Sequence, residues 1–214
     1  MKGPIYAKFS RVLRHIVFVL IGTWLLSIGL GLHALLQYKG TPGNADATPQ
    51  KWPANQIISP PADKPLLVMF AHPRCACTKA SLEQLNILCG RGKGSFDAAI
   101  LFFEPENPPG AWTKTDLIES ARSMPGLRVF FDDGGNVAKR FGVQTSGHTL
   151  LYGPQGNLLF SGGITGARGH LGDNRGCDAV LKLVRNESIA PDRAKSDVFG
   201  CALFEVCTNN QPTR

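Results

Sequence analysis

Two cysteines stand one residue apart, Cys75 and Cys77, within the segment FAHPRCACT that spans residues 70–78. The thiolate is the reactive form of cysteine, and both a helix N-terminus and a neighbouring cation such as Arg74 lower the pKa of a thiol. The pattern therefore predicts that Cys75 attacks a disulfide and that Cys77 resolves the resulting mixed disulfide. A C-x-C disulfide closes a small ring, so we expect it to be strained and readily reduced. The alternative is a structural bridge or two inert, buried thiols.

Apolar periodicity predicts the elements that position these cysteines. Residues 66–71 (LLVMFA) have the pattern of a buried strand, and residues 78–88 carry apolar side chains at helical spacing. Further strands are expected at residues 98–103, 127–131, 149–152 and 158–161, and further helices at residues 113–123, 136–141 and 177–185. Strands that alternate with helices favour an α/β fold, in which chemistry gathers beyond the carboxyl ends of parallel strands. The loop at residues 72–77 has that position.

The order of these elements over residues 65–185 resembles the thioredoxin-like fold. Thioredoxins carry a strand, a cysteine pair that opens a helix, and later an aromatic-Gly-Val run, a Pro-Thr-Leu run and a hairpin; here residues 141–143 read FGV and residues 148–150 read HTL. The resemblance implies a central mixed sheet flanked by helices. The extra strand and helix between residues 98 and 131 are similar to the insertion of the membrane-anchored TlpA and ResA branch. The strings FAHPRCACT, SGGITGARGH and FGCALF also resemble the bacterial RedB-like proteins.

The chain departs from the thioredoxin pattern at two positions. Thr78 stands where the second cysteine of a C-x-x-C pair would be, and His148 stands where thioredoxins have a cis-proline. The peptide bond before His148 is therefore expected to be trans. The resemblance carries the role of nucleophile over to Cys75, but it does not supply a substrate.

If the resemblance holds, the hairpin returns the chain to the cysteine loop. His148 is then a candidate catalytic residue beside Cys75 and Cys77, as a proton shuttle or a metal ligand, because imidazole titrates near neutral pH. The expected surroundings of the site are His72, Pro73, Arg74, Thr78, Gly147, Thr149, Gly163, Arg168 and His170. The alternative is that these residues only form hydrogen bonds with the loop backbone.

Four further cysteines lie outside the C-x-C pair. Cys89 and Cys177 fall on apolar helix faces, where a core position is expected. Cys201 and Cys207 flank the run ALFEV, and an oxidising compartment would permit a bridge between them or from Cys201 back to the domain. The sequence does not choose among these pairings.

The N-terminal region predicts a membrane anchor. Residues 16–36 form an apolar stretch long enough to cross a bilayer as a helix. Lys and Arg are more frequent in residues 1–15 than just after the stretch, so the positive-inside rule places residues 1–15 in the cytoplasm and the remaining chain in the periplasm or outside the cell. Cleavage at the A-x-A pattern of residues 45–47 is the alternative, but that pattern lies well beyond the apolar run, and a retained signal anchor is favoured.

The rest of the chain divides by composition. Residues 37–64 are rich in Pro, Ala, Asn and Thr and are expected to be a tether, residues 65–186 the thioredoxin-like domain, and residues 187–214 a polar tail with one apolar patch. The net charge is +7, but Lys and Arg form no basic stripe, so nucleic acid is not an expected partner.

The leading functional hypothesis is a thiol-disulfide oxidoreductase that acts on a protein thiol or disulfide and needs no cofactor. The alternative is copper handling by Cys75, Cys77 and His148, because thiolate and imidazole ligands suit Cu(I). The membrane-anchored Sco copper chaperones have a thioredoxin fold, although they carry C-x-x-x-C rather than C-x-C. The direction of electron flow does not follow from either hypothesis.

Overall fold

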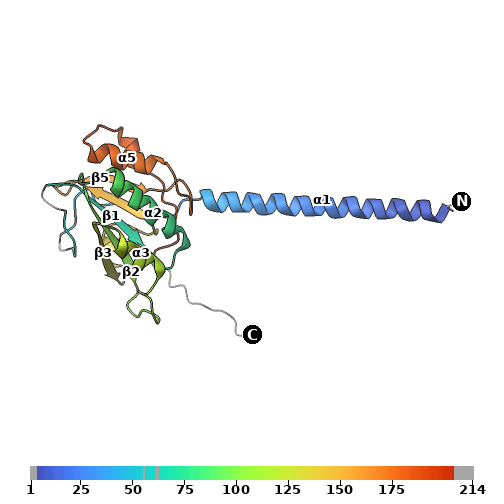
Figure 1. The fold of residues 1–214 in the computed structure, drawn as a ribbon, viewed down its shortest axis with the longest axis horizontal. Coiled ribbons are helices and arrows are strands. Elements are labelled where there is room, and N and C mark those ends of the chain that lie inside the picture. The colour runs from blue at the N-terminus through green and yellow to red at the C-terminus, as the bar shows by residue number, and fades with distance from the viewer. Residues whose placement is uncertain (1–3, 55, 61–62, 205–214) are drawn as a thin grey trace. The chain divides into compact units, whose positions relative to one another are not determined.

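The computed structural model describes residues 4–54, 56–60 and 63–204, with side chains from residue 13 onward (Figure 1). Cys207 lies outside the described residues. The chain forms two units, residues 1–40 and 41–214. The first unit contains helix α1 (Pro4–Gly40), which extends the predicted apolar segment at both ends. Within it, Leu13–Gly40 is long and apolar enough to cross a membrane, with a mean hydropathy of 2.0.

The second unit contains a five-stranded sheet in the order β3-β2-β1-β4-β5 (Figure 1). The strands are β1 (Leu66–Ala71), β2 (Asp97–Glu104), β3 (Leu127–Asp133), β4 (His148–Tyr152) and β5 (Leu158–Gly163). β1, β2 and β3 run parallel, whereas β4 is antiparallel to both β1 and β5. The helices are α2 (Ala76–Arg91), α3 (Asp116–Ser123), α4 (Asn136–Arg140), α5 (Arg175–Val184) and the 3-10 helix η1 (Pro191–Ala194). Every expected strand and helix is present, with small shifts at the ends.

Both faces of the sheet are covered, which explains why every residue of β1 is buried. On one face, apolar side chains of α2, α3 and α5 pack against the sheet, among them Leu85, Ile118 and Val180. On the other face, α4 has only five residues and covers a small part of the apolar surface. The remaining area is covered by two irregular segments, the described part of residues 41–60 and residues 195–204, which hold buried Ile58 and Leu203 respectively.

Residues 41–60 differ from the expected tether, because they pack against the sheet domain. The ring of Trp52 lies 4.9 Å from the ring of Phe141 and 5.0 Å from that of Tyr152. The Tyr152 hydroxyl donates to the Pro49 carbonyl over 2.8 Å, and the Leu158 amide donates to the Gln50 carbonyl over 2.9 Å. The polar composition of the segment conceals these contacts, since one aromatic side chain supplies much of its apolar surface.

The described part of the C-terminal tail also packs against the domain. The Leu203 amide donates to the Gln144 carbonyl over 2.8 Å, and the Gly163 amide donates to the Asp197 carbonyl over 3.2 Å. A side chain at Gly163 would press against that carbonyl, so the glycine permits the close approach of the tail to β5. Val198 and Leu203 are buried, which gives the predicted apolar patch its place in the core.

Three parallel strands followed by an antiparallel hairpin, with helices on both faces, form the thioredoxin-like α/β arrangement that the sequence predicts. The segment between β2 and β4 contributes α3, β3 and α4, and β3 becomes an edge strand beside β2. The chain leaves the carboxyl end of β1 directly into the cysteine loop. The sheet therefore places residues 72–77 at the edge where its parallel strands end.

Candidate functional site

Cys75 stands at the junction between the β1 loop and helix α2. It is the N-cap residue of α2, with an extended backbone (φ −85°, ψ 117°), and its carbonyl accepts a hydrogen bond from the Thr78 amide over 3.0 Å. Its sulfur therefore lies where unpaired amide groups and the helix dipole favour negative charge. Cys77 lies in the first turn of the same helix.

Aromatic packing and one buried histidine hold the loop in this conformation. The imidazole Nδ1 of His72 accepts a hydrogen bond from the Arg74 amide over 3.1 Å, and the His72 ring lies 5.3 Å from the ring of Trp112. The Arg74 guanidinium also lies over the Trp112 ring, 4.7 Å from its centroid. The Trp112 indole is itself fixed by donating to the Phe103 carbonyl over 2.9 Å. His72 and Arg74 thus shape the loop through contacts with an aromatic cluster.

Ser146 connects three elements around the cysteines. Its hydroxyl accepts from the His72 amide over 2.8 Å and lies 2.7 Å from the Thr78 hydroxyl of α2. Its amide donates to the Cys201 carbonyl over 2.9 Å. The next residue, Gly147, donates its amide to the Phe70 carbonyl over 2.7 Å at the end of β1. Residues 146–147, directly before β4, therefore form hydrogen bonds with both the cysteine loop and the tail, and we call them the frame.

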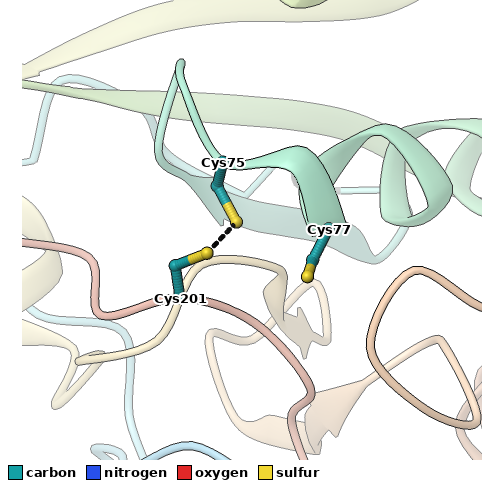
Figure 2. A group of neighbouring side chains, drawn as sticks. All are labelled: Cys75, Cys77 and Cys201. Carbon is teal, nitrogen blue, oxygen red and sulfur yellow. Dashed lines mark hydrogen bonds between the residues drawn. The ribbon is translucent and has the colours of Figure 1, made fainter. Parts of the chain in front are cut away.

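Three sulfur atoms gather at this frame (Figure 2). The Sγ atoms of Cys75, Cys77 and Cys201 lie within 4.8 Å of one another. Among the described residues, these three cysteines form a group that could bind one metal ion. The Cys75 and Cys201 sulfurs are hydrogen-bonded at 2.7 Å. Cys75 is 5% exposed, whereas Cys77 and Cys201 are half-buried. The tail thus brings a third thiol to the C-x-C pair and covers Cys75.

The pKa of Cys75 is lower than that of an ordinary thiol, whereas the pKa values of Cys77 and Cys201 are higher. The hydrogen bond with Cys201 lowers the pKa of Cys75 to about 4, with a further contribution from hydrogen bonds to Thr78 and against the effect of burial. The same hydrogen bond raises the pKa of Cys201, and burial raises it further. Burial and the nearby Cys75 charge raise the pKa of Cys77. Near neutral pH, the lowered pKa of Cys75 favours its thiolate and the raised pKa of Cys201 favours its thiol.

Arg168 lies beside the sulfur group, in the loop between β5 and α5. Its guanidinium donates to the Gly200 carbonyl, one residue before Cys201. Its charge lowers the pKa of Cys77 and of Cys201, although burial and the Cys75 charge outweigh this effect. The arginine therefore holds the tail and offsets the negative charge that develops on the cluster.

His148, expected among the catalytic residues, begins β4 and does not belong to the group of three sulfurs. Its Nε2 lies 2.9 Å from the Ser161 hydroxyl on β5. Burial lowers the pKa of His148 to about 4, so the ring is neutral near pH 7. The peptide bond before it is trans, as predicted, since the described chain has no cis peptide. In the sheet, His148 pairs with Phe70 of β1 and with Gly163 of β5.

The other expected surroundings divide into framework residues and one distant residue. Thr149 is buried in β4 and donates its hydroxyl to the Gly147 carbonyl over 3.1 Å. Pro73 is buried in the turn before Cys75, whereas His170 is exposed on the loop before α5 and lies outside the group of three sulfurs. Thr78 and Gly147 contact the site directly, through Ser146 and the end of β1.

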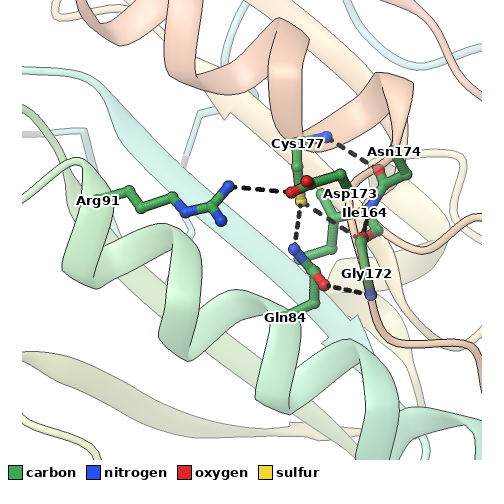
Figure 3. Close-up of polar contacts among 7 residues, drawn as sticks. All are labelled: Gln84, Arg91, Ile164, Gly172, Asp173, Asn174 and Cys177. Atoms are coloured by element: carbon green, nitrogen blue, oxygen red, sulfur yellow. Dashed lines mark hydrogen bonds and ion pairs between the residues drawn. The ribbon is translucent and has the colours of Figure 1, made fainter.

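Cys89 and Cys177 occupy the helix-packing regions that the sequence predicts for them. Figure 3 shows Cys177 at the N-terminus of α5, where its sulfur accepts from Gln84 over 3.1 Å and donates to the Ile164 carbonyl over 3.4 Å. Asn174 caps the same helix by accepting from the Cys177 amide over 3.0 Å. Burial raises the pKa of both thiols, that of Cys89 to about 11. Both therefore remain protonated and unreactive at neutral pH.

Cys201 is a candidate site residue that the sequence left unassigned. A bridge from Cys201 back to the domain was one of the open alternatives, and the run FGCALF around it carried the RedB-like resemblance. The glycine in that run is the available signal: a side chain at Gly200 would overlap the Ser146 carbonyl oxygen. Only a glycine permits the tail to approach this closely.

Solved structures with the same fold include two of uncharacterised proteins. A hypothetical protein from Sinorhizobium meliloti is 17% identical, with a TM-score of 0.58, over 77% of this chain and 98% of its own. A conserved protein from Geobacillus kaustophilus is 10% identical, with a TM-score of 0.60, over 78% and 98%. The exposed lipoprotein thioredoxin Etrx1 from Streptococcus pneumoniae is 17% identical, with a TM-score of 0.40, over 57% and 84%. No protein-family model matches the chain, and neither does any curated protein.

Proposed function

We propose that this protein is a membrane-anchored thiol-disulfide oxidoreductase whose nucleophile is Cys75. The observation that carries the proposal is the Cys75 sulfur at the N-terminus of α2, with a pKa lowered to about 4 and two other thiols within 4.8 Å. A thiolate at neutral pH beside a second thiol is what thiol-disulfide exchange requires. The resemblance to the TlpA, ResA and RedB-like proteins supports the same chemistry.

The exchange proceeds in two balanced steps. The Cys75 thiolate attacks one sulfur of a substrate disulfide, which forms a mixed disulfide with Cys75 and releases the other substrate sulfur as a thiolate. A second protein thiol then attacks the Cys75 sulfur, forms an internal disulfide, and releases the first substrate sulfur. The substrate gains two electrons and the protein loses them. The reverse sequence oxidises a substrate dithiol.

Helix α1 supports an anchored location for this chemistry. Leu13–Gly40 has the length and hydropathy of a membrane span. The basic residues that precede the apolar stretch favour a cytoplasmic N-terminus, with residues 41–214 in the periplasm or outside the cell. Disulfides persist in such compartments, so a protein thiol or disulfide is the expected partner.

Soft-metal handling is a second candidate function, favoured by the grouping of three sulfurs. Three thiolates are suitable ligands for Cu(I). However, two sulfurs bound to one metal ion at ~2.3 Å are roughly 3.8 Å apart in tetrahedral geometry. The Cys75 and Cys201 sulfurs lie at 2.7 Å, so they would have to separate by about 1 Å. The redox function therefore fits the geometry better, and His148 is replaced by Cys201 as the third candidate ligand.

The test uses the full-length protein in detergent. The protein and its Cys75→Ser and Cys89→Ser variants are mixed with oxidised glutathione, and the release of reduced glutathione is followed over time. We expect rapid exchange in the unsubstituted protein and in Cys89→Ser, and none in Cys75→Ser. Equal exchange by Cys75→Ser would overturn the proposal. Absence of exchange together with stoichiometric Cu(I) retention that Cys75→Ser abolishes would establish the metal-handling function instead.

A further inference from the structure

We infer that Cys201, rather than Cys77, is the cysteine that resolves the mixed disulfide on Cys75. This inference rests on the proposed function and extends it, because it assigns the internal disulfide to a partner outside the C-x-C motif. The tail segment at residues 199–203 then becomes part of the active site.

The positions of Cys75 and Cys77 on α2 disfavour a bond between them. Cys75 is the N-cap residue and Cys77 follows in the first turn. Side chains two positions apart on a helix point in different directions, although the sulfurs of Cys75 and Cys77 lie within 4.8 Å of each other. A disulfide between them would also close a very small ring, and its geometry would require the first turn of α2 to unwind. That turn carries the Thr78 amide and hydroxyl, which help to stabilise the Cys75 thiolate.

Cys201 approaches Cys75 from a different element and already faces it (Figure 2). The two sulfurs are 2.7 Å apart, and a disulfide bond has a length of about 2.05 Å, so a displacement of about 0.7 Å brings them to bonding distance. Such a displacement is within reach of small side-chain rotations. No helical turn has to be broken.

The backbone of Cys201 is fixed on the same frame as the cysteine loop. The Ser146 amide donates to the Cys201 carbonyl over 2.9 Å, and an isolated antiparallel bridge joins Thr145 to Ala202. The guanidinium of Arg168 holds the Gly200 carbonyl. Because Ser146 also binds the loop through the His72 amide, Cys75 and Cys201 are positioned by one short segment. This is the preorganisation that a rapid intramolecular step requires.

The resolving step balances without any further reactant. The Cys201 sulfur attacks the Cys75 sulfur of the mixed disulfide, the Cys75–Cys201 bond forms, and the substrate sulfur leaves with the electron pair of the broken bond. The proton of the Cys201 thiol passes to the leaving thiolate. In the reverse direction, an external thiolate attacks the half-buried Cys201 sulfur and expels Cys75 as a thiolate, and a thiol of low pKa is a good leaving group.

Tryptic cleavage separates the two alternatives cleanly. Trypsin cuts after Arg74, Lys79 and Lys195, so Cys75 and Cys77 fall in one peptide, residues 75–79, and Cys201 falls in another, residues 196–214. A Cys75–Cys77 disulfide is internal to the first peptide, whereas a Cys75–Cys201 disulfide links the two. Cys207 lies in the second peptide and Cys77 in the first, so a linked pair identifies Cys75–Cys201 uniquely only in the Cys207→Ser protein that also carries Cys77→Ser.

The experiment oxidises the full-length Cys207→Ser protein in detergent with one equivalent of oxidised glutathione, then alkylates and digests it without reduction. We expect the linked peptides in this protein and in its Cys77→Ser derivative. We expect Cys201→Ser to retain glutathione on Cys75 and to resolve it at least ~10-fold more slowly.

The failures of the two proposals are distinguishable. An internal disulfide in peptide 75–79, with resolution in Cys201→Ser as fast as in its parent, overturns the role of Cys201 and leaves the oxidoreductase function intact. Absence of both a glutathione adduct on Cys75 and an internal disulfide that includes Cys75, in all variants, overturns the proposed function itself. Resolution that slows equally in Cys77→Ser and in Cys201→Ser also contradicts the inference, since it assigns the step to no single thiol.

Discussion

The sulfur of Cys201 is hydrogen-bonded to the sulfur of Cys75 at 2.7 Å, although the two residues are 126 positions apart in the chain. The helix N-terminus of α2 provides one part of the environment that stabilises a Cys75 thiolate, and the tail provides the other. Cys75 is only 5% exposed, and the tail brings Cys201 against its sulfur. Reactivity at Cys75 is therefore linked to the position of the tail.

The first prediction concerns the pH dependence of Cys75 alkylation. The folded protein holds the pKa of Cys75 at about 4, below the ordinary thiol value of ~8.5, so the thiolate persists as the pH falls from 8 towards 4. In a Cys77→Ser protein, the rate at which iodoacetamide alkylates Cys75 should then vary little with pH over that range. The product is quantified in the tryptic peptide 75–79. Cys201→Ala lacks the hydrogen bond that lowers the Cys75 pKa, so its midpoint should move towards ~8.5.

Cys177→Ala is the matched control for that measurement, because Cys177 is a buried thiol that has its own partners in Gln84 and Ile164. Its alkylation profile at Cys75 should coincide with that of the parent. An unchanged midpoint in Cys201→Ala would show that the helix N-terminus alone activates Cys75.

The second prediction concerns His148 and the free energy of unfolding. Burial lowers the pKa of His148 to about 4, below the unfolded value of ~6.5, so the folded state disfavours the protonated ring. The unfolded chain binds this proton more readily than the folded protein does. The free energy of unfolding therefore falls by up to about 3 kcal/mol as the pH decreases from 6.5 towards 4. The variant His148→Gln should lose less stability over that interval when urea unfolding is measured at each pH.

The exposed His170 provides the comparison, as His170→Gln should keep the pH dependence of the parent protein. The disulfide-exchange rate at neutral pH should be nearly equal in His148→Gln and the parent, because His148 binds Ser161 rather than a sulfur. A large loss of exchange rate in a stably folded His148→Gln protein would restore the catalytic role predicted from the sequence.

The sequence was sufficient for the fold and for the position of Cys75 at the start of a helix, because both depend on local patterns. Strand β1 is a continuous apolar run, and Cys75 lies directly between that run and the periodic positions of α2. The long-range contacts were not predictable in this way. Trp52 and Cys201 lie in polar segments without periodicity, and their partners Phe141 and Cys75 are far away in the chain. A single side chain outside any periodic pattern gives no sequence signal for the residue that it contacts.

The third prediction tests the packing of residues 41–60. Trp52 contacts the rings of Phe141 and Tyr152, so Trp52→Ala removes aromatic contacts and leaves a gap on that face of the sheet. We expect the free energy of unfolding of the full-length protein to fall by about 2–3 kcal/mol, less than for a fully buried tryptophan. Lys51→Ala, at the exposed neighbouring position, should change it by less than ~0.5 kcal/mol. Equal stability of the two variants in urea titrations would support the tether predicted from composition.

The fourth prediction links the tail to the chemistry through Gly200. A methyl group at this position would overlap the Ser146 carbonyl oxygen, so Gly200→Ala must displace the tail from the frame that holds Cys201. The hydrogen bond from the Ser146 amide to the Cys201 carbonyl is then weakened, and the Cys201 sulfur moves away from Cys75. We expect three changes together: a greater rate of Cys75 alkylation by bulky maleimides at pH 8, a higher Cys75 pKa, and a smaller yield of the Cys75–Cys201 disulfide.

Gly166→Ala is the control, because its added methyl group makes only ordinary contacts, and it should leave all three unchanged. If Gly200→Ala forms the disulfide in full yield, the contact between the tail and Ser146 does not position Cys201.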